Sequence, residues 1–380
     1  MREEVDMNTQ VGTGNESRKE VGMDKEVGMD METTFSPEVV RAVDEALARA
    51  EQTVGERWAA KLATRGDRSE VAKGPGRPAD WILPGLERGS LGLLVGAGGV
   101  GKSFFLLPML LAVARGDGWP WAPSERRAPR QVLYINAEDT DDLLDRRVRS
   151  VYAAGVEEGW SNAKFVSVAG EPKAHAVGRF GEPGGLAPAL SEMCDGGGFD
   201  LIVLDPLVSF SGASEADNSL VGAMVDELRR IAVELGVAVL VVHHASQAAI
   251  LGGQMDRAES ARGVTALVNG ARWMATYARP SDDERDALVA GWGSEGQVRR
   301  LRRLATVKVN DGGDDAPPVW LEVGEGGVPA VLGPKDADAI EAALSASSSS
   351  ASRGAGRGGG SGGKGGSKKG NSLTSWMENK

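Results

Sequence analysis

Apolar runs alternate with stretches of helical periodicity through the middle of this chain. The runs of strand length are near-continuous, which is typical of parallel strands covered on both faces. They lie at 91–95, 132–136, 165–168, 201–204 and 237–242. Helical spacing of apolar residues marks 104–115, 141–154, 186–195 and 218–235. This order predicts an α/β fold, a doubly wound and mainly parallel sheet with helices on both faces. The last two apolar runs, 304–309 and 319–323, are expected to pair antiparallel.

The terminal segments lack this alternation. Residues 1–35 are polar and repeat K-E-V-G-M-D twice, which indicates a disordered acidic tail. Residues 336–380 are rich in Gly, Ser and Lys and indicate a flexible tail without a core. The segment G-P-G-R-P at 74–78 breaks the chain ahead of the folded core, which is expected to occupy 76–335.

One linker helix is expected ahead of the core, over 36–75. Ser36 and Pro37 suit the N-cap and the first position of a helix. An apolar stripe at three- or four-residue spacing follows and includes Trp58 and Leu62. The stripe is expected either to pack on its own domain or to dock on a neighbouring subunit.

Charge and composition narrow the class of protein. The formal net charge of −11 gives no basic field over the whole chain, so any contact with nucleic acid must be local or lie in the channel of an assembly. The single cysteine, Cys194, cannot form an intrachain disulfide. The N-terminus lacks the apolar core of a signal peptide, and the apolar runs are too short to span a bilayer. We therefore expect a cytoplasmic protein without a membrane partner.

Residues 96–103 read G-A-G-G-V-G-K-S and stand between a predicted strand and a predicted helix. A phosphate-binding P-loop requires this position, because its glycines let the backbone wrap around a phosphate and the helix start presents free N–H groups. Lys102 is predicted to reach the β- and γ-phosphates of ATP, and Ser103 to ligate Mg²⁺. The predicted nucleotide-binding residues are Gly96, Gly98, Gly99, Val100, Gly101, Lys102 and Ser103.

Two carboxylates end predicted strands. Asp205 closes the run L-I-V-L-D and is predicted to hold Mg²⁺ together with Ser103. Glu138 ends V-L-Y-I-N-A-E, and the carboxyl ends of parallel strands meet at one sheet edge, so Glu138 is expected near Lys102. There it is predicted to activate the water that attacks the γ-phosphate. Asp139 is the adjacent rival, and Glu138 is preferred for its position at the strand end.

Two of the three histidines, His243 and His244, end the run 237–242. Neighbouring residues on a strand point to opposite faces, so the pair is a poor metal site. One imidazole is well placed to donate to a γ-phosphate as a sensor. The alternative is a pair that caps a helix or satisfies the core.

Several cationic side chains follow the histidines. Arg262, Arg272 and Lys308, the last in the segment K-V-N, are candidates to reach a nucleotide bound on another subunit, as an arginine finger does. A solvated surface charge is the ordinary alternative for any one of them.

Together these motifs resemble the RecA-like ATPases and, within them, the RepA-like hexameric replicative helicases of plasmids and phages. The resemblance covers most of 81–310 and rests on the P-loop segment, V-L-Y-I-N-A-E-D, L-I-V-L-D-P-L, V-L-V-V-H-H, A-R-G-V-T-A-L-V-N-G-A-R-W and V-K-V-N. It implies Glu138 as catalytic base, and His244 or His243 as sensor. It also implies that Arg262 or Lys308 acts in trans, in a ring of six identical subunits with ATP at each boundary.

The resulting hypothesis is an ATP-hydrolysing, ring-forming motor acting on single-stranded DNA. The loop 211–218 is acidic, and 245–260 is mainly apolar apart from Arg257, so few groups are seen that grip a phosphate backbone. One alternative is therefore a RecA/KaiC-type regulatory or recombination ATPase without unwinding activity. Another is a P-loop kinase for a small molecule, although no arginine-rich lid is visible in the sequence.

Overall fold

A computed structural model describes residues 41, 53–64, 67–75, 79–194, 198–212, 218–244, 265–310 and 317–355. The chain forms two compact units, Met1–Arg77 and Pro78–Lys380. The predicted acidic tail and the start of the predicted linker helix lie outside the described residues, as does the chain after 355.

The first unit contains a helix over 53–64 and a short helix, α2 (Ser69–Lys73). Trp58 and Leu62 of the predicted apolar stripe are 72% and 74% exposed. The described part of the stripe is therefore presented on the surface of its own unit. An amphipathic helix is normally stabilised by burial of its apolar face, so both expectations, packing on the chain's own core and docking on a neighbouring subunit, stay open.

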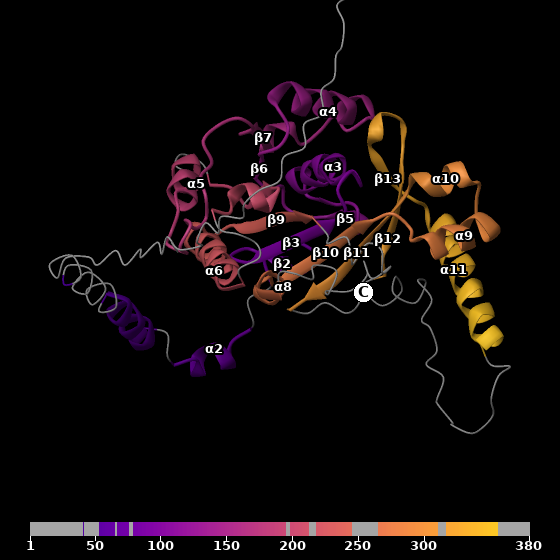
Figure 1. Cartoon of the computed structure of the whole chain (residues 1–380). Helices are drawn as coiled ribbons and strands as arrows, with labels where there is room; N and C mark the ends of the chain where they lie inside the picture. Colours follow the sequence, from indigo (N-terminus) through magenta and orange to yellow (C-terminus); the bar gives the residue numbers. More distant parts are fainter. Residues whose placement is uncertain are drawn as a thin grey trace, which may run out of the picture. The chain divides into compact units, whose positions relative to one another are not determined.

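The described part of the second unit is built on one nine-stranded sheet (Figure 1). Its strands are β3 (Leu91–Gly96), β6 (Val132–Asn136), β7 (Ala163–Ser167), β8 (Leu201–Asp205), β9 (Ala238–His244), β10 (Trp273–Ala278), β11 (Leu301–Val309), β12 (Val319–Val323) and β13 (Pro329–Val331). Their order across the sheet is β13-β12-β11-β10-β3-β9-β8-β6-β7. Strands from β10 to β7 run parallel, and β11 to β13 add an antiparallel edge. The predicted antiparallel pair is therefore confirmed as β11 and β12.

Helices cover both faces of the sheet. The helices that pack on the two faces are α3 (Lys102–Arg115), α4 (Asp141–Ala153), α5 (Leu186–Cys194), α6 (Asn218–Leu235) and α8 (Thr265–Gly270). Leu93 and Val95 of β3 pack in a core with α5, α6 and α8, whereas Leu94 packs in a core with α3 and α4. Alternate residues of a strand point to opposite faces, so β3 is buried on both. The doubly wound, mainly parallel α/β fold predicted from the sequence, with helices on both faces, is confirmed.

Smaller elements complete the second unit. They are the hairpins β1 (Trp81–Leu83) with β2 (Leu86–Glu87) and β4 (Asp117–Gly118) with β5 (Ala122–Arg126), the helices α9 (Asp282–Gly291), α10 (Glu295–Arg300) and α11 (Pro334–Ala355), and the 3₁₀ turns η1 (Trp160–Asn162), η2 (Leu207–Phe210) and η4 (Glu325–Gly327). Among the described helices, none is both long and apolar enough to cross a membrane.

The C-terminal tail begins later in the chain than predicted. Residues 336–380 are predicted to be flexible, but α11 extends from Pro334 to Ala355. Ile340 is fully buried in a third small core, and the indole of Trp320 donates a hydrogen bond to Glu341 (2.8 Å). The composition of the whole tail hides a short amphipathic stretch at its beginning, so the folded part of the chain extends further than predicted.

Candidate nucleotide-binding site

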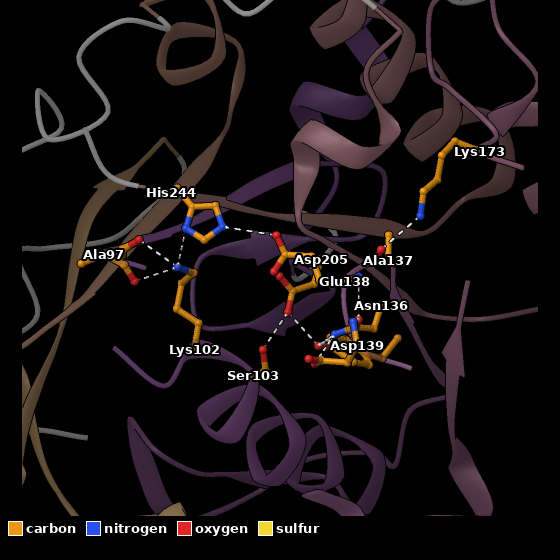
Figure 2. A network of polar contacts seen from close by, with 12 residues as sticks. Ala97, Lys102, Ser103, Asn136, Ala137, Glu138, Asp139, Lys173, Asp205 and His244 are labelled. Carbon is orange, nitrogen blue, oxygen red and sulfur yellow. Dashed lines mark hydrogen bonds and ion pairs between the residues drawn. The ribbon is translucent and has the colours of Figure 1, made fainter. Parts of the chain in front are cut away.

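The predicted chemical groups follow neighbouring parallel strands of the sheet. The P-loop follows β3, His244 ends β9, Asp205 ends β8 and Glu138 comes shortly after β6. These strands are adjacent in the order β3-β9-β8-β6, with Gly96 level with His244 and Asn136 level with Asp205. Figure 2 shows the resulting network of side chains. The carboxyl edge of such a sheet is where open α/β folds bind ligands.

The glycines of the P-loop have distinct structural reasons. Gly99 and Gly101 adopt φ of 69° and 96°, in the left-handed region that favours glycine. A Cβ added at Gly96 would lie 2.5 Å from the carbonyl oxygen of Tyr277 and 3.1 Å from Cδ of Lys102. The loop is therefore shaped by backbone conformation at two positions and by close packing at a third.

Lys102 begins α3 and is almost buried. Its Nζ donates to the carbonyls of Gly96 (2.8 Å) and Ala97 (3.0 Å) and lies 3.3 Å from Nδ1 of His244 (Figure 2). Burial lowers the pKa of Lys102, and the charges of Asp205 and Glu138 oppose that shift. The ammonium group is thus held inside the loop, where an arriving phosphate offers it new acceptors.

Two arginines support the P-loop from outside. The buried side chain of Arg302 on β11 donates from Nε to the carbonyl of Val100 (2.8 Å), and Arg279 donates to the carbonyl of Gly99 (3.4 Å). Burial lowers the pKa of the Arg302 guanidinium. The role of Arg302 was not predicted from the sequence, because its loop partner is some two hundred positions earlier in the chain. Its only local signal is an arginine at an inward position of an apolar strand.

Ser103 and Asp205 form the predicted metal pair. The Ser103 hydroxyl donates to Oδ2 of Asp205 (3.2 Å), and the Tyr134 hydroxyl donates to the same oxygen (2.7 Å). Burial raises the pKa of Asp205, whereas the Tyr134 hydrogen bond and the charge of Lys102 lower it. A hydroxyl beside a carboxylate is the donor set that Mg²⁺ takes together with substrate phosphates, so these residues fit the ion.

The two candidate bases lie in different environments. Asp139 is 9% exposed, and both of its carboxylate oxygens accept hydrogen bonds from Arg147 on α4. The Glu138 side chain is 58% exposed, and its Oε1 lies 3.8 Å from Nε2 of His244 (Figure 2). A carboxylate engaged on both oxygens by an arginine is poorly suited to accept a proton from water. The geometry favours Glu138.

The paired histidines point in different directions. His243 is buried, whereas the ring of His244 stands between Lys102 and Glu138. The alternation of side chains along β9 accounts for the difference. Of the two, His244 is the one whose ring lies beside the P-loop lysine.

The candidate cations for action in trans lie elsewhere. Lys308, on β11, donates to the carbonyls of Val268 (2.8 Å) and Asn269 (3.3 Å) at the end of α8. Burial lowers the pKa of Lys308, and the nearby charge of Arg272 adds to that shift. Arg262 lies outside the described residues, as do 245–260 and most of the loop 211–218.

The fold and this sheet edge define a P-loop nucleotide-binding domain. The sequence profile of the family described as AAA domain matches residues 60–249, half of the chain, and the chain belongs to this family. The matched segment includes the P-loop, Glu138, Asp205 and His244. The chain is also similar to a solved structure described as an ATPase domain, with 14% sequence identity over 77% of this chain and 99% of that one and a TM-score of 0.44.

Proposed function

We propose that this chain is an ATP-hydrolysing, ring-forming motor that acts on single-stranded DNA, as the replicative helicase of a plasmid or phage. The observation that carries the hydrolytic part is the convergence of Lys102, Asp205 and Glu138 at one sheet edge. A binding switch without hydrolysis has no need for the exposed carboxylate of Glu138 beside the P-loop.

The residues divide the reaction among them. Lys102 and the P-loop amides bind the β- and γ-phosphates, and Ser103 with Asp205 holds Mg²⁺, which supplies charge neutralisation. Glu138 accepts a proton from the attacking water while the oxygen of that water bonds to the γ-phosphorus. The bond from that phosphorus to the β,γ-bridging oxygen breaks, and ADP and phosphate leave. His244, whose ring lies between Lys102 and Glu138, donates to the γ-phosphate.

The position of Lys308 supports a role in trans. It pairs with Met274 on β10, which pairs with Leu93 on β3, three residues before Gly96. Lys308 is therefore about 10 Å across the sheet and about 10 Å back along the strands from the start of its own P-loop. That is too far for its ammonium group to reach its own nucleotide, so a useful phosphate contact must be made on another subunit. The exposed apolar stripe with Trp58 and Leu62 also supports a ring, because it offers a surface for contact with the neighbouring subunit.

The defining experiment measures assembly and turnover together. Mass photometry with and without ATP and single-stranded DNA is expected to detect six-subunit particles, and steady-state ATPase activity is expected to rise with the DNA. Separation of a forked duplex then tests unwinding. Hydrolysis without DNA stimulation or unwinding would favour a regulatory RecA/KaiC-type ATPase. ATP-dependent phosphorylation of a small molecule would favour a kinase.

Mixing inactive variants is expected to restore turnover. Lys102→Ala removes the P-loop lysine, and Lys308→Ala or Arg262→Ala removes a cation lent to the neighbour. In a mixed ring some boundaries then combine an intact P-loop with an intact cation, so ATPase activity reappears at a fraction of the wild-type rate.

The matched control mixes Lys102→Ala with Glu138→Gln. Both groups belong to the same subunit's site, so no boundary is repaired and the mixture stays inactive. If Lys308→Ala and Arg262→Ala mixtures also stay inactive after subunit exchange has been demonstrated, neither residue acts in trans.

A further inference from the structure

Both the oxygen and the nitrogen of the Asn136 side-chain amide, at the end of β6, are hydrogen-bonded. It is 1% exposed, and its Oδ1 accepts hydrogen bonds from the backbone N–H groups of Glu138 (3.0 Å) and Asp139 (2.7 Å). Its Nδ2 donates to the hydroxyl of Tyr134 (2.9 Å) and to Oδ2 of Asp139 (3.1 Å). The Asn136 side chain therefore shapes the turn that carries Glu138 and also hydrogen-bonds to Tyr134 on its own strand, β6.

Tyr134 continues this chain of hydrogen bonds to the metal pair. Its ring is fully buried, and its hydroxyl donates to Oδ2 of Asp205 (2.7 Å). Burial raises the pKa of Tyr134 well above its ordinary range, and the charge of Asp205 adds to the shift. The hydroxyl keeps its proton at working pH, so it is a permanent donor to the carboxylate.

The remaining backbone of the turn is fastened as well. Ser167 donates to the carbonyl of Asp139 (2.6 Å), and Lys173 donates to the carbonyl of Ala137 (3.1 Å), as Figure 2 shows for the lysine. The N–H of Ala137 donates to the carbonyl of Asp205 (2.8 Å). The segment around Glu138 thus has little freedom, while the Glu138 side chain itself remains exposed.

We propose that Tyr134 and Asn136 are positioning residues that set the metal ligand Asp205 and the base Glu138 in one geometry. This inference rests on the roles proposed above for those two carboxylates. Two polar side chains in an otherwise apolar buried strand are costly unless fully hydrogen-bonded, and apolar residues would fill the strand more cheaply. Their hydrogen bonds lead to the two carboxylates of the hydrolytic site, and groups that orient a ligand or base commonly change activity about 10- to 100-fold.

The metal arm is tested with Tyr134→Phe. The variant keeps the ring and removes the hydroxyl that orients Asp205, so the Mg²⁺ concentrations for half-maximal ATPase activity and for half-maximal binding of a fluorescent ATP analogue are both expected to rise about 10-fold. Saturating Mg²⁺ should restore most of kcat. Tyr152→Phe, the same change at an exposed tyrosine on α4, is the matched control and should leave the Mg²⁺ dependence unchanged. A Tyr134→Phe protein that only melts earlier, with the wild-type Mg²⁺ dependence, contradicts the metal arm.

The base arm is tested at position 136. Asn136→Ala is expected to lower kcat about 10- to 100-fold while the affinity for a fluorescent ATP analogue stays within about 2-fold. Asn136→Asp separates positioning from simple packing. Its carboxyl keeps the acceptor for the two N–H groups and regains a donor only when protonated.

The Asn136→Asp variant should therefore have a pH signature. The charged form of the introduced carboxyl cannot donate to Tyr134 or Asp139, and Arg147 is already engaged by Asp139. The ratio of the variant's kcat to that of the wild type is expected to rise as the pH falls through the pKa of the introduced carboxyl. The charged and titratable groups around the position are Tyr134 on β6, Glu138 and Asp139 in the turn, Arg147 on α4, Lys173 after β7, and Asp205 on β8 with Lys102 beyond it.

The outcomes separate this inference from the proposed function. Wild-type ATPase activity that depends on Lys102 establishes the reference. If that activity is missing, the proposed function fails. If it is present, and the variants at 134 and 136 keep wild-type kcat, Mg²⁺ dependence and a flat pH ratio, the proposed function stands and the positioning role is wrong.

Discussion

Lys102→Ala is expected to abolish ATP turnover while the protein stays folded. The ammonium group is already held in the P-loop by the carbonyls of Gly96 and Ala97, where the β- and γ-phosphates are proposed to bind. Removing a preorganised charge that stabilises the transition state commonly costs about 10²- to 10³-fold in kcat, and the loss of phosphate binding adds to that. Steady-state phosphate release under saturating Mg²⁺ measures the effect.

The matched control is Lys164→Ala, at an exposed lysine on β7. It should keep wild-type turnover, and both variants should retain the circular dichroism and melting behaviour of the native chain. Near-normal hydrolysis by folded Lys102→Ala would remove the P-loop assignment and, with it, the proposed function.

Glu138→Gln is expected to bind nucleotide normally and to lose hydrolysis. The amide keeps the shape of the side chain but cannot take a proton from water, so the loss belongs in kcat and not in affinity. General-base catalysis is typically worth about 10²- to 10⁴-fold, which sets the expected loss. Titration with a fluorescent ATP analogue and single-turnover hydrolysis separate the two effects.

Asp139→Asn gives the contrast to that variant. It weakens a buried, doubly hydrogen-bonded pair with Arg147, so the free energy of unfolding should fall by about 1.5–3 kcal/mol, the usual size of a hydrogen bond to a charged group. Turnover per folded protein should stay well above that of Glu138→Gln. The reverse order of the two kcat values would transfer the base to Asp139.

Local patterns were sufficient to predict most strands of the sheet and the P-loop. An apolar run followed by closely spaced glycines, a lysine and a long apolar helix predicted β3, the loop and α3, because each signal lies within a few residues of the next. Alternation along β9 predicted that His243 and His244 diverge. It did not say which one faces Lys102, because that depends on the register between β9 and β3.

Long-range contacts explain what was missed. Tyr134 reaches Asp205, about seventy positions later, and Arg302 reaches Val100, about two hundred positions earlier. No window of sequence contains both partners. The strand β10 was not predicted, because W-M-A-T-Y-A becomes a strand by pairing with β3 and β11, which lie far from it in the sequence.

The place of β10 has a mechanical consequence. It is hydrogen-bonded to β3 on one side and to β11 on the other, so backbone hydrogen bonds join the P-loop strand to the strand of Lys308, with a bulge in the β10–β11 register next to the Met274–Lys308 pair. A shift of β3 on nucleotide binding would therefore pass to the strand of Lys308 through main-chain hydrogen bonds. In the proposed ring, the nucleotide bound by one subunit would thus be mechanically coupled to the Lys308 side chain with which that subunit contacts its neighbour's nucleotide. ATP hydrolysis at successive sites of the ring would then proceed in a fixed order rather than independently.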